Sequence, residues 1–225
     1  MPEKYLIDLQ YAPCLAYMAV CMAAPDKVKV DIHEHYQKQS YRNRCYILSS
    51  QGIVPLSIPI IKGNSQHKQA MCQVMIDNSQ RWQQIHWRSI VTAYRKAPYF
   101  EHYADYFTPI YAQQYDLLAD FNWALLTTCL QILGASQTPQ KSTQYQAQAD
   151  LPPSEQDLRD LIHPKKGYAP GRQNDTKPYL QVFGKPFEEF VPNLSILDLL
   201  FCCGVEARSY LQQNFNKTHL LQQLI

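Results

Sequence analysis

Hydrophobic and polar positions at the start of the chain predict a strand, a helix and a second strand. Residues 4–9 and 14–24 form a short and a long apolar run, and residues 27–33 alternate between polar and apolar side chains. A short apolar run and a strict alternation are both typical of strands, whereas the longer run between them is typical of a buried helix. Because a strand–helix–strand unit is the usual seed of a parallel pair of strands, the pattern predicts an α/β fold.

A hairpin and three helices are predicted next. Residues 45–49 and 53–60 are expected to pair around Gly52. Pro55 and Pro59 favour an edge position for the second arm, because proline cannot donate a ladder hydrogen bond. The remaining elements of this part are a strand at 71–76 and helices near 79–95, 98–112 and 116–133.

The last third of the chain is predicted to begin with an exposed segment. Residues 135–153 are rich in Gln, Ser, Thr and Ala and end in two prolines, a composition typical of linkers. The elements expected beyond it are a short helix near 154–162, a strand at 179–183, a helix at 194–203 capped by Asn193, and a last helix at 205–216.

These elements predict one α/β domain with a mixed sheet flanked by helices. Residues 1–134 are its core, and residues 135–178 are a linker or excursion that contains the short helix. Residues 179–225 supply a C-terminal strand and helices that complete the same domain.

The composition narrows the class of protein. The chain has 225 residues, of which 46% are hydrophobic and 18% are charged, and its formal net charge is +2. This content of apolar residues argues against extensive disorder, and so small a net charge argues against a broad surface for nucleic acid. The seven glycines form neither of the common glycine-rich phosphate loops.

The cysteines and the lack of a long apolar run indicate the compartment. The seven cysteines are odd in number, form no Cys-x-x-Cys pair and lie mostly in apolar runs, which is typical of free, buried thiols in a reducing environment. No stretch reaches the roughly 18 apolar residues of a membrane span. Asp8 and Pro13 interrupt the apolar start, unlike a secretion signal. We therefore expect a cytoplasmic protein without a membrane span.

The most informative stretch for chemistry is polar, aromatic and basic. Lys38, Arg42 and Arg44 place three cations within seven residues, beside Tyr36 and Tyr41. In an extended segment the cations share one face, which fits a phosphate or a carboxylate. The alternative is a solvated loop whose arginines pair with acidic neighbours. Interleaved tyrosines and cations also suit single-stranded nucleic acid, against which the small net charge argues.

His86 is the candidate general base. It lies mid-helix, with Trp82 and Ile90 one turn away on an apolar face. An ordinary imidazole titrates near neutral pH, as a general base requires. The alternative is a core histidine that serves only packing. Glu101 falls in the first turn of the next predicted helix, where the helix dipole favours its charge, and a short link brings it toward His86 as an orienting group.

Three further features carry weaker signals. Asp31 ends a predicted parallel strand, a common place for site residues in α/β sheets. Cys14 stands at a helix start, where a thiolate is favoured, with a buried structural cysteine as the alternative. His33, Glu34 and His35 carry ligand-type side chains, but alternate residues of a strand face apart and the spacing matches no common zinc motif, so no metal site is predicted.

Several blocks of the sequence, taken in order, resemble the WbqC-like proteins of bacteria. They are residues 36–44 followed by Gly52 and 56–59, Trp82 with His86 and Trp87, 93–94 with 97–101, and 118–122. The C-terminal residues 191–201 are similar to the Bacteroidetes-type branch of this family. The chain departs from the family's usual opening, a Gln-Pro-x-Tyr-Leu-Pro-Trp-like turn, because Tyr11 and Pro13 remain but the tryptophan and the first proline are absent.

The resemblance implies a role in the synthesis of O-antigen and other polysaccharides, for which glycine transfer has been suggested. Our leading hypothesis is a transferase that moves an aminoacyl group onto a small or sugar-linked acceptor, with His86 as the general base and Glu101 as its orienting group. The cations allow the substrate to be phosphorylated. The expected substrate-binding residues are Lys38, Arg42, Arg44, Tyr11, Tyr36, Tyr41 and Asp31.

The alternative hypothesis is a non-catalytic binding or scaffold module that uses the same surface. A pocket that contains both His86 and the cations favours the enzyme. A histidine buried against Trp82, far from the cations, favours the module. The sequence points to no particular cofactor.

Overall fold

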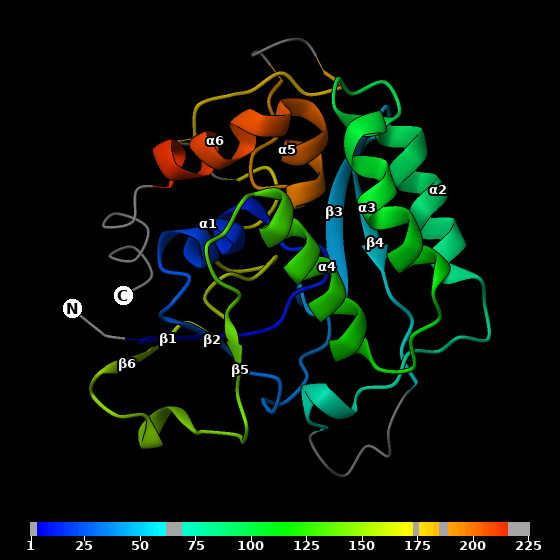
Figure 1. The fold of residues 1–225 in the computed structure, drawn as a ribbon. Helices are drawn as coiled ribbons and strands as arrows, with labels where there is room; N and C mark the ends of the chain where they lie inside the picture. Colours follow the sequence, from blue (N-terminus) through cyan, green and yellow to red (C-terminus); the bar gives the residue numbers. More distant parts are fainter. Residues whose placement is uncertain (1–3, 62–68, 173–175, 185–188, 216–225) are drawn as a thin grey trace.

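A parallel pair of strands opens the fold. The computed structural model describes residues 4–61, 69–172, 176–184 and 189–215. Strand β1 (Lys4–Ile7) pairs in parallel with strand β2 (Val28–Val30), and helix α1 (Leu15–Ala23) joins them and packs beside the sheet (Figure 1). The predicted strand–helix–strand unit is therefore confirmed.

Two further strands extend this sheet on either side. Strand β5 (Gln140–Lys141) pairs with β2, and strand β6 (Glu155–Asp157) pairs with β1, both in parallel, so the strand order is β5-β2-β1-β6. Both lie inside the stretch that its composition predicts to be a linker or excursion, and the helix predicted near 154–162 is wrong. The physical reason is that these strands are short and polar at the sheet edges, where pairing needs no apolar pattern.

The predicted hairpin is confirmed and forms a separate ribbon. Strands β3 (Arg44–Ser49) and β4 (Gly52–Ser57) pair antiparallel, with Ser49 opposite Gly52. Gly52 has a φ of 92°, a backbone conformation that L side chains rarely adopt, so glycine suits this tight turn.

Three helices follow the hairpin, and the first of them packs against it. Helices α2 (Trp82–Tyr94), α3 (Phe100–Ala112) and α4 (Leu118–Ile132) match the three helices that the apolar spacing predicts. Figure 1 shows α2 and α3 side by side next to the hairpin, with α4 between the hairpin and α1. Each helix buries one apolar face in the common core, as amphipathic spacing requires.

Two predicted strands are wrong. Residues 71–76 form a single 3-10 turn (Met71–Gln73) followed by isolated bridges, of which one joins Ile76 to Ile60. Residues 179–183 form no strand. In both places apolar side chains contact the core from irregular backbone, among them Val74, Ile76 and Tyr179. Within the described ranges no neighbouring strand continues the pairing.

The C-terminal helices α5 (Ile196–Cys203) and α6 (Ala207–Asn214) match the prediction, but the cap of α5 differs. The hydroxyl of Ser195 accepts from the backbone N–H two residues later. Asn193 instead accepts from the backbone N–H of Ala16 at 3.0 Å, and so ties the start of α1 to the chain that enters α5.

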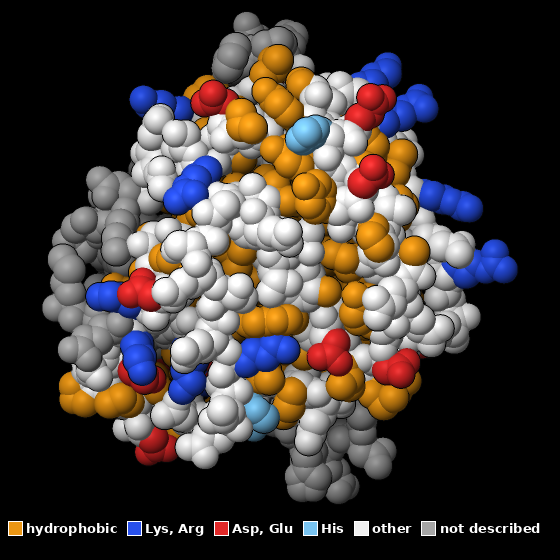
Figure 2. Space-filling view, in the orientation of Figure 1, with side chains coloured by type: hydrophobic (Ala, Val, Ile, Leu, Met, Phe, Trp, Pro, Cys, Tyr) orange, Lys and Arg blue, Asp and Glu red, His pale blue; other side chains and the backbone are white. Residues whose placement is uncertain are grey.

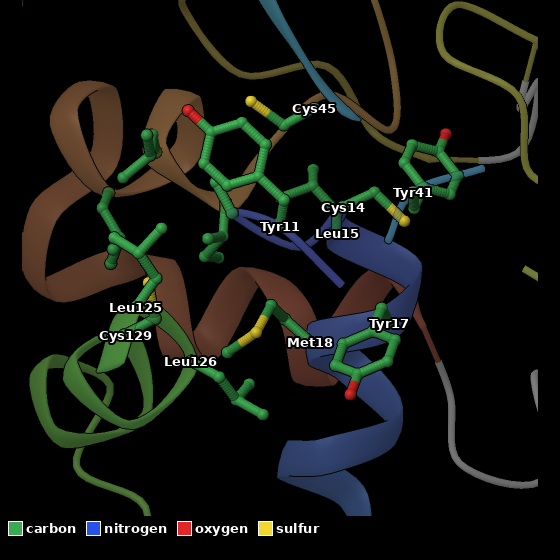
Figure 3. Packing of buried hydrophobic residues seen from close by; sticks show 14 of the residues in the cluster. Tyr11, Cys14, Leu15, Tyr17, Met18, Tyr41, Cys45, Leu125, Leu126 and Cys129 are labelled. Carbon is green, nitrogen blue, oxygen red and sulfur yellow. The ribbon is translucent and has the colours of Figure 1, made fainter. Parts of the chain in front are cut away.

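One continuous core joins these elements. Figure 3 shows Met18 of α1 facing Leu126 of α4, with Tyr11 reaching toward Cys45 of the hairpin. All seven cysteines are free and five of them are buried, which confirms the prediction from their spacing. None of the helices in the described ranges is long and apolar enough to cross a membrane. The cytoplasmic location stays a prediction.

Candidate functional site

Polar side chains follow the strands of the parallel sheet at one common edge. Asp8 directly follows β1, Asp31 directly follows β2, Ser142 directly follows β5, and Asp157 is the last residue of β6. All four strands run in the same direction, so their carboxyl ends meet at this edge. In open parallel sheets ligands bind outside the carboxyl ends of the strands, so a binding site is expected at this edge.

A buried arginine gathers three carboxyl groups there. The Nε and Nη2 atoms of Arg42 donate to both oxygens of Glu34 at 2.7 and 2.5 Å, in a bidentate pair. Nη2 also lies 2.8 Å from Asp160, and Nη1 lies 3.9 Å from Asp8. The Arg42 side chain is 1% exposed, so these acidic partners rather than water satisfy its charge.

A second arginine holds two more carboxyl groups at the same edge. Arg159 donates from Nη1 to Asp31 at 2.6 Å and from Nη2 to Asp157 at 2.6 Å. Asp31 is fully buried and also accepts from the hydroxyl of Ser142 at 2.8 Å and from the backbone N–H of His33 at 2.9 Å. Asp31 thus connects β2, β5 and the segment after β6, and its role in binding a substrate stays a prediction.

Acidic groups outnumber cations in this cluster. Five carboxyl groups share two guanidinium groups, namely Asp8, Asp31, Glu34, Asp157 and Asp160 around Arg42 and Arg159. Burial raises the pKa of Glu34 to about 8, although Arg42 acts to lower it. Burial also raises the pKa of Asp8. The charge balance therefore favours uptake of a proton or of a cationic group.

A cleft of about 430 Å³ opens beside these groups, and we call it the carboxylate cleft. Its lining includes Glu34, Tyr36, Tyr145, Asp157, Arg159 and Asp160. The Tyr145 ring is 46% exposed, with the His35 ring 4.9 Å from it and the Arg159 guanidinium 5.7 Å above it. The cleft therefore combines acidic groups with the flat face of an aromatic ring.

The three predicted anion-binding cations do not line this cleft. Arg42 is committed to carboxylates, Arg44 donates to the Ser57 hydroxyl at 2.8 Å, and Lys38 is exposed. Figure 2 shows the lysines and arginines of one face scattered among uncharged and acidic side chains. The alternative interpretation of the basic stretch, arginines paired with acidic neighbours, describes Arg42.

The predicted tyrosines are divided between the cleft and the core. Tyr36 is half-buried and lines the carboxylate cleft. Tyr41 is buried and donates to the backbone carbonyl of Tyr168 at 2.9 Å. Tyr11 is fully buried, so of these three only Tyr36 stands where a ligand in the cleft meets it.

His86 lies in an aromatic part of the core. Its side chain is 6% exposed, its ring packs edge-on against Trp82 at 5.2 Å, and its Nδ1 lies 2.9 Å from the phenol oxygen of Tyr11. Burial lowers the pKa of His86 to about 4. Glu101 is exposed on the first turn of α3, and within the described ranges no hydrogen bond joins it to His86. This arrangement favours the core interpretation of His86.

The two other candidate chemistries gain no support. Burial raises the pKa of Cys14 to about 12, which keeps the thiol protonated at neutral pH. No group of three or more His, Cys, Asp or Glu side chains in the described part of the chain is arranged to hold a metal ion. His33 instead places Nδ1 3.6 Å from the sulfur of Cys72.

The comparison with protein families covers this arrangement except for Asp8, which precedes the matched residues. The model of the WbqC-like protein family matches residues 10–162, which include every residue that lines the carboxylate cleft. The chain belongs to the WbqC-like protein family. The match also includes Arg42 and His86 but not the C-terminal helices, and the narrower placement in a Bacteroidetes-type branch stays a prediction.

A relative of this WbqC-like chain has no described activity. An uncharacterized protein of Mycobacterium tuberculosis (strain ATCC 25618 / H37Rv), Rv1507c, is 28% identical over 235 residues, which cover 94% of this chain and 98% of the relative. No solved structure matches the chain. The site must therefore be interpreted from its own geometry.

Several residues of this site were not predicted from the sequence. Asp8 carries the same signal as Asp31, a carboxylate directly after an apolar strand, and was open to the same inference. The run from Asp157 through Arg159 to Asp160 lay in the predicted linker. Tyr145, in the same stretch, carried no signal that distinguishes it from an ordinary loop residue.

Proposed function

We propose that this WbqC-like protein is a transferase whose acceptor, an amino sugar or a similar hydroxyl-rich amine, binds in the carboxylate cleft. The observation that carries the proposal is the excess of carboxyl groups over guanidinium groups at the carboxyl edge of the parallel sheet. A cleft with this charge favours an ammonium group and disfavours a phosphate.

The shape of the cleft supports a sugar rather than a simple amine. The exposed face of Tyr145 offers an apolar surface against which the C–H face of a sugar ring can pack. Asp160 is partly exposed at the cleft and presents a carboxylate to an ammonium or a hydroxyl. Gln37 lies beside it and donates to the same carboxylate, so the group is held in place.

Glu34 is the group in the cleft whose proton affinity suits transfer chemistry. A general base works best when its pKa lies near the operating pH, and burial places that of Glu34 at about 8. In the proposed step the bound ammonium group first releases one proton to water, and the resulting neutral amine attacks the acyl carbon of an activated aminoacyl donor. A nitrogen–carbon bond forms, the bond from the acyl carbon to the leaving group breaks, and the amine proton passes to Glu34. We therefore propose Glu34, rather than His86, as the base.

Binding to the cleft is tested with a matched pair of sugars. We expect glucosamine to raise the melting temperature of the full chain, because a ligand that binds the native state stabilises it by mass action. N-acetylglucosamine, which lacks the ammonium group, should give a smaller shift. Asp160→Asn should abolish the difference between the two sugars, whereas Asp105→Asn, at an exposed position of α3, should preserve it. Equal shifts with both sugars on the unaltered protein contradict the proposal.

A non-catalytic binding module is the second candidate, and the burial of His86 favours it. His86 is the general base expected from the sequence, and its buried position makes it a poor candidate for that role. The two functions are separated by incubating the protein with glucosamine and a glycyl thioester or a glycyl adenylate. N-glycylglucosamine detected by mass spectrometry, and lost in Glu34→Gln, supports the transferase. Binding of glucosamine without product supports the module.

A further inference from the structure

We propose that a second cleft, formed where α2 begins and α3 ends, binds a neutral saccharide. This cleft also measures about 430 Å³, and it shares no lining residue with the carboxylate cleft. We call it the amide cleft. The residues on which the argument rests are Gln80, Arg81, Gln84, Trp87, Tyr111 and Gln114. The inference is independent of the proposed function.

The wall of the amide cleft is a rigid aromatic pair. The Trp87 ring stacks on the Tyr111 ring, with 5.3 Å between centroids and 21° between planes. Tyr111 is buried and packs edge-on against Phe121 in the core, so the pair has a fixed support. Trp87 also stacks on Phe100, with 6.3 Å between centroids and 25° between planes. The ring is only partly buried, and the part of it that lines the cleft offers an apolar surface to the C–H groups of a pyranose.

The polar groups of the amide cleft are uncharged donors and acceptors. Gln80, Gln84 and Gln114 are exposed, and their side chains make no hydrogen bond to any part of the described chain. An amide offers both a carbonyl acceptor and N–H donors, which matches the dual character of a sugar hydroxyl. The indole N–H of Trp87 likewise has no partner in the described ranges, whereas that of Trp82 donates to Asn78 at 3.1 Å.

The charge of the lining decides between neutral and ionic ligands. Among the residues that the structure describes, no aspartate or glutamate lines the amide cleft, and Arg81 is the one charged side chain in its lining. An ammonium ligand therefore finds no carboxylate, and a phosphate finds one exposed arginine without a second cation. Aromatic and amide groups together fit a neutral, hydroxyl-rich ring best, so the two clefts differ in the sugars they prefer.

The test is a titration of the full chain with cellobiose and, separately, with N,N′-diacetylchitobiose, in which saturation-transfer difference NMR measures binding. At about 10 mM saccharide we expect saturation to pass from the protein to the C–H protons of the sugar, with a Kd on the order of 1 mM. The double variant Gln84→Ala/Gln114→Ala keeps the aromatic pair and alters only exposed side chains, and it should weaken binding about tenfold. Trp87→Ala should abolish the signal.

Two controls make the outcome decisive. Gln131→Ala removes an exposed glutamine from α4, outside both clefts, and should leave saccharide binding unchanged. Asp105→Asn, at an exposed position of α3 outside the lining of both clefts, should also leave it unchanged. The proposal is overturned if neither saccharide receives saturation from the protein. It is also overturned if Gln84→Ala/Gln114→Ala binds the saccharides as tightly as the unaltered protein does. This second outcome does not depend on whether Trp87→Ala folds.

Discussion

The phenol oxygen of Tyr11 lies 2.9 Å from Nδ1 of His86, and this hydrogen bond joins the turn after β1 to the middle of α2. The same phenol lies 3.1 Å from the hydroxyl of Tyr111 on α3. All three side chains are buried, so the network satisfies polar atoms that water does not reach. Its members connect three elements, which is a structural role, and burial favours the neutral form of the imidazole within it.

Neutral burial of His86 makes the stability of the protein depend on pH. In the unfolded chain a histidine takes up a proton near pH 6.5, but burial lowers the pKa of folded His86 to about 4. Below pH 6.5 the unfolded state therefore binds more protons than the folded state, and the free energy of unfolding falls as the pH falls toward 4. The loss attributable to His86 over this window is about 3 kcal/mol.

Urea denaturation at a series of pH values measures this loss. His86→Gln should reduce the fall in stability between pH 6.5 and 4 by about 3 kcal/mol, whatever the variant costs at neutral pH. His102→Gln, at an exposed position of α3, should leave the profile as it is in the unaltered protein. Parallel profiles for His86→Gln and the unaltered protein contradict a neutral, buried His86.

Gly204 ends α5 at a place where no other side chain fits. Its φ is +55°, and a Cβ added there would lie 2.3 Å from a ring carbon of Tyr99. Gly52 also has a positive φ, of +92°, but no atom lies within 4 Å of its Cβ position. Gly52→Ala should therefore cost only the backbone strain, about 1 kcal/mol. Gly204→Ala should cost a further ~1–3 kcal/mol, because the ring and the helix end must move apart.

Thermal and urea denaturation of both glycine variants distinguish strain from overlap. Equal losses of stability in Gly52→Ala and Gly204→Ala would mean that the Tyr99 ring moves away at no cost. A larger loss in Gly204→Ala that is partly recovered by adding Tyr99→Ala would locate the cost in this contact.

The elements predicted correctly are those that bury an apolar face. The long apolar run of α1 and the spacing of α2, α3 and α4 follow from burial, which a single sequence records directly. Strands β5 and β6 have the sequences Gln-Lys and Glu-Gln-Asp, which contain no apolar residue and so give no sign of burial. Backbone hydrogen bonds to neighbours far away in the chain hold them, and the local residue pattern carries no trace of those neighbours.

The candidate site was predictable only where a residue carried its signal alone. Asp31 could be found because a polar residue directly after a buried parallel strand is informative by itself. The pairing of Arg42 with Asp160 could not, because the two residues lie far apart in the chain and meet only when β6 joins the sheet. Without its partners, Arg42 had the same local signature as an anion-binding arginine.

Glu34 should give the opposite pH dependence to His86. The pKa of an ordinary glutamate is near 4.5, and burial raises that of folded Glu34 to about 8. Between these values the folded state holds a proton that the unfolded state has released, so the free energy of unfolding falls as the pH rises from 4.5 to 8. Glu34→Gln should remove this fall, as measured by urea denaturation across that range.

Exposed Glu101 provides the control for this experiment. Glu101→Gln should leave the decline in stability toward pH 8 unchanged. A decline that persists undiminished in Glu34→Gln would show that Glu34 stays ionised throughout, and the proposed role of this residue as a proton acceptor near neutral pH would lose its basis.

Arg42 and Arg44 offer a direct comparison of a buried and a partly exposed arginine. Arg42→Gln removes the donor that both oxygens of Glu34 accept from and the cation beside Asp8 and Asp160, and breaking a buried, hydrogen-bonded cluster in this way costs roughly 3–5 kcal/mol. Arg44→Gln removes one hydrogen bond to the Ser57 hydroxyl and should cost about 1 kcal/mol.

The same pair of variants tests the two interpretations of the basic stretch. If Arg42 serves the fold, Arg42→Gln should lower the urea midpoint far more than Arg44→Gln. Similar small losses in both variants, together with weakened binding of inorganic phosphate, would restore the anion-binding interpretation and count against an amine in the carboxylate cleft.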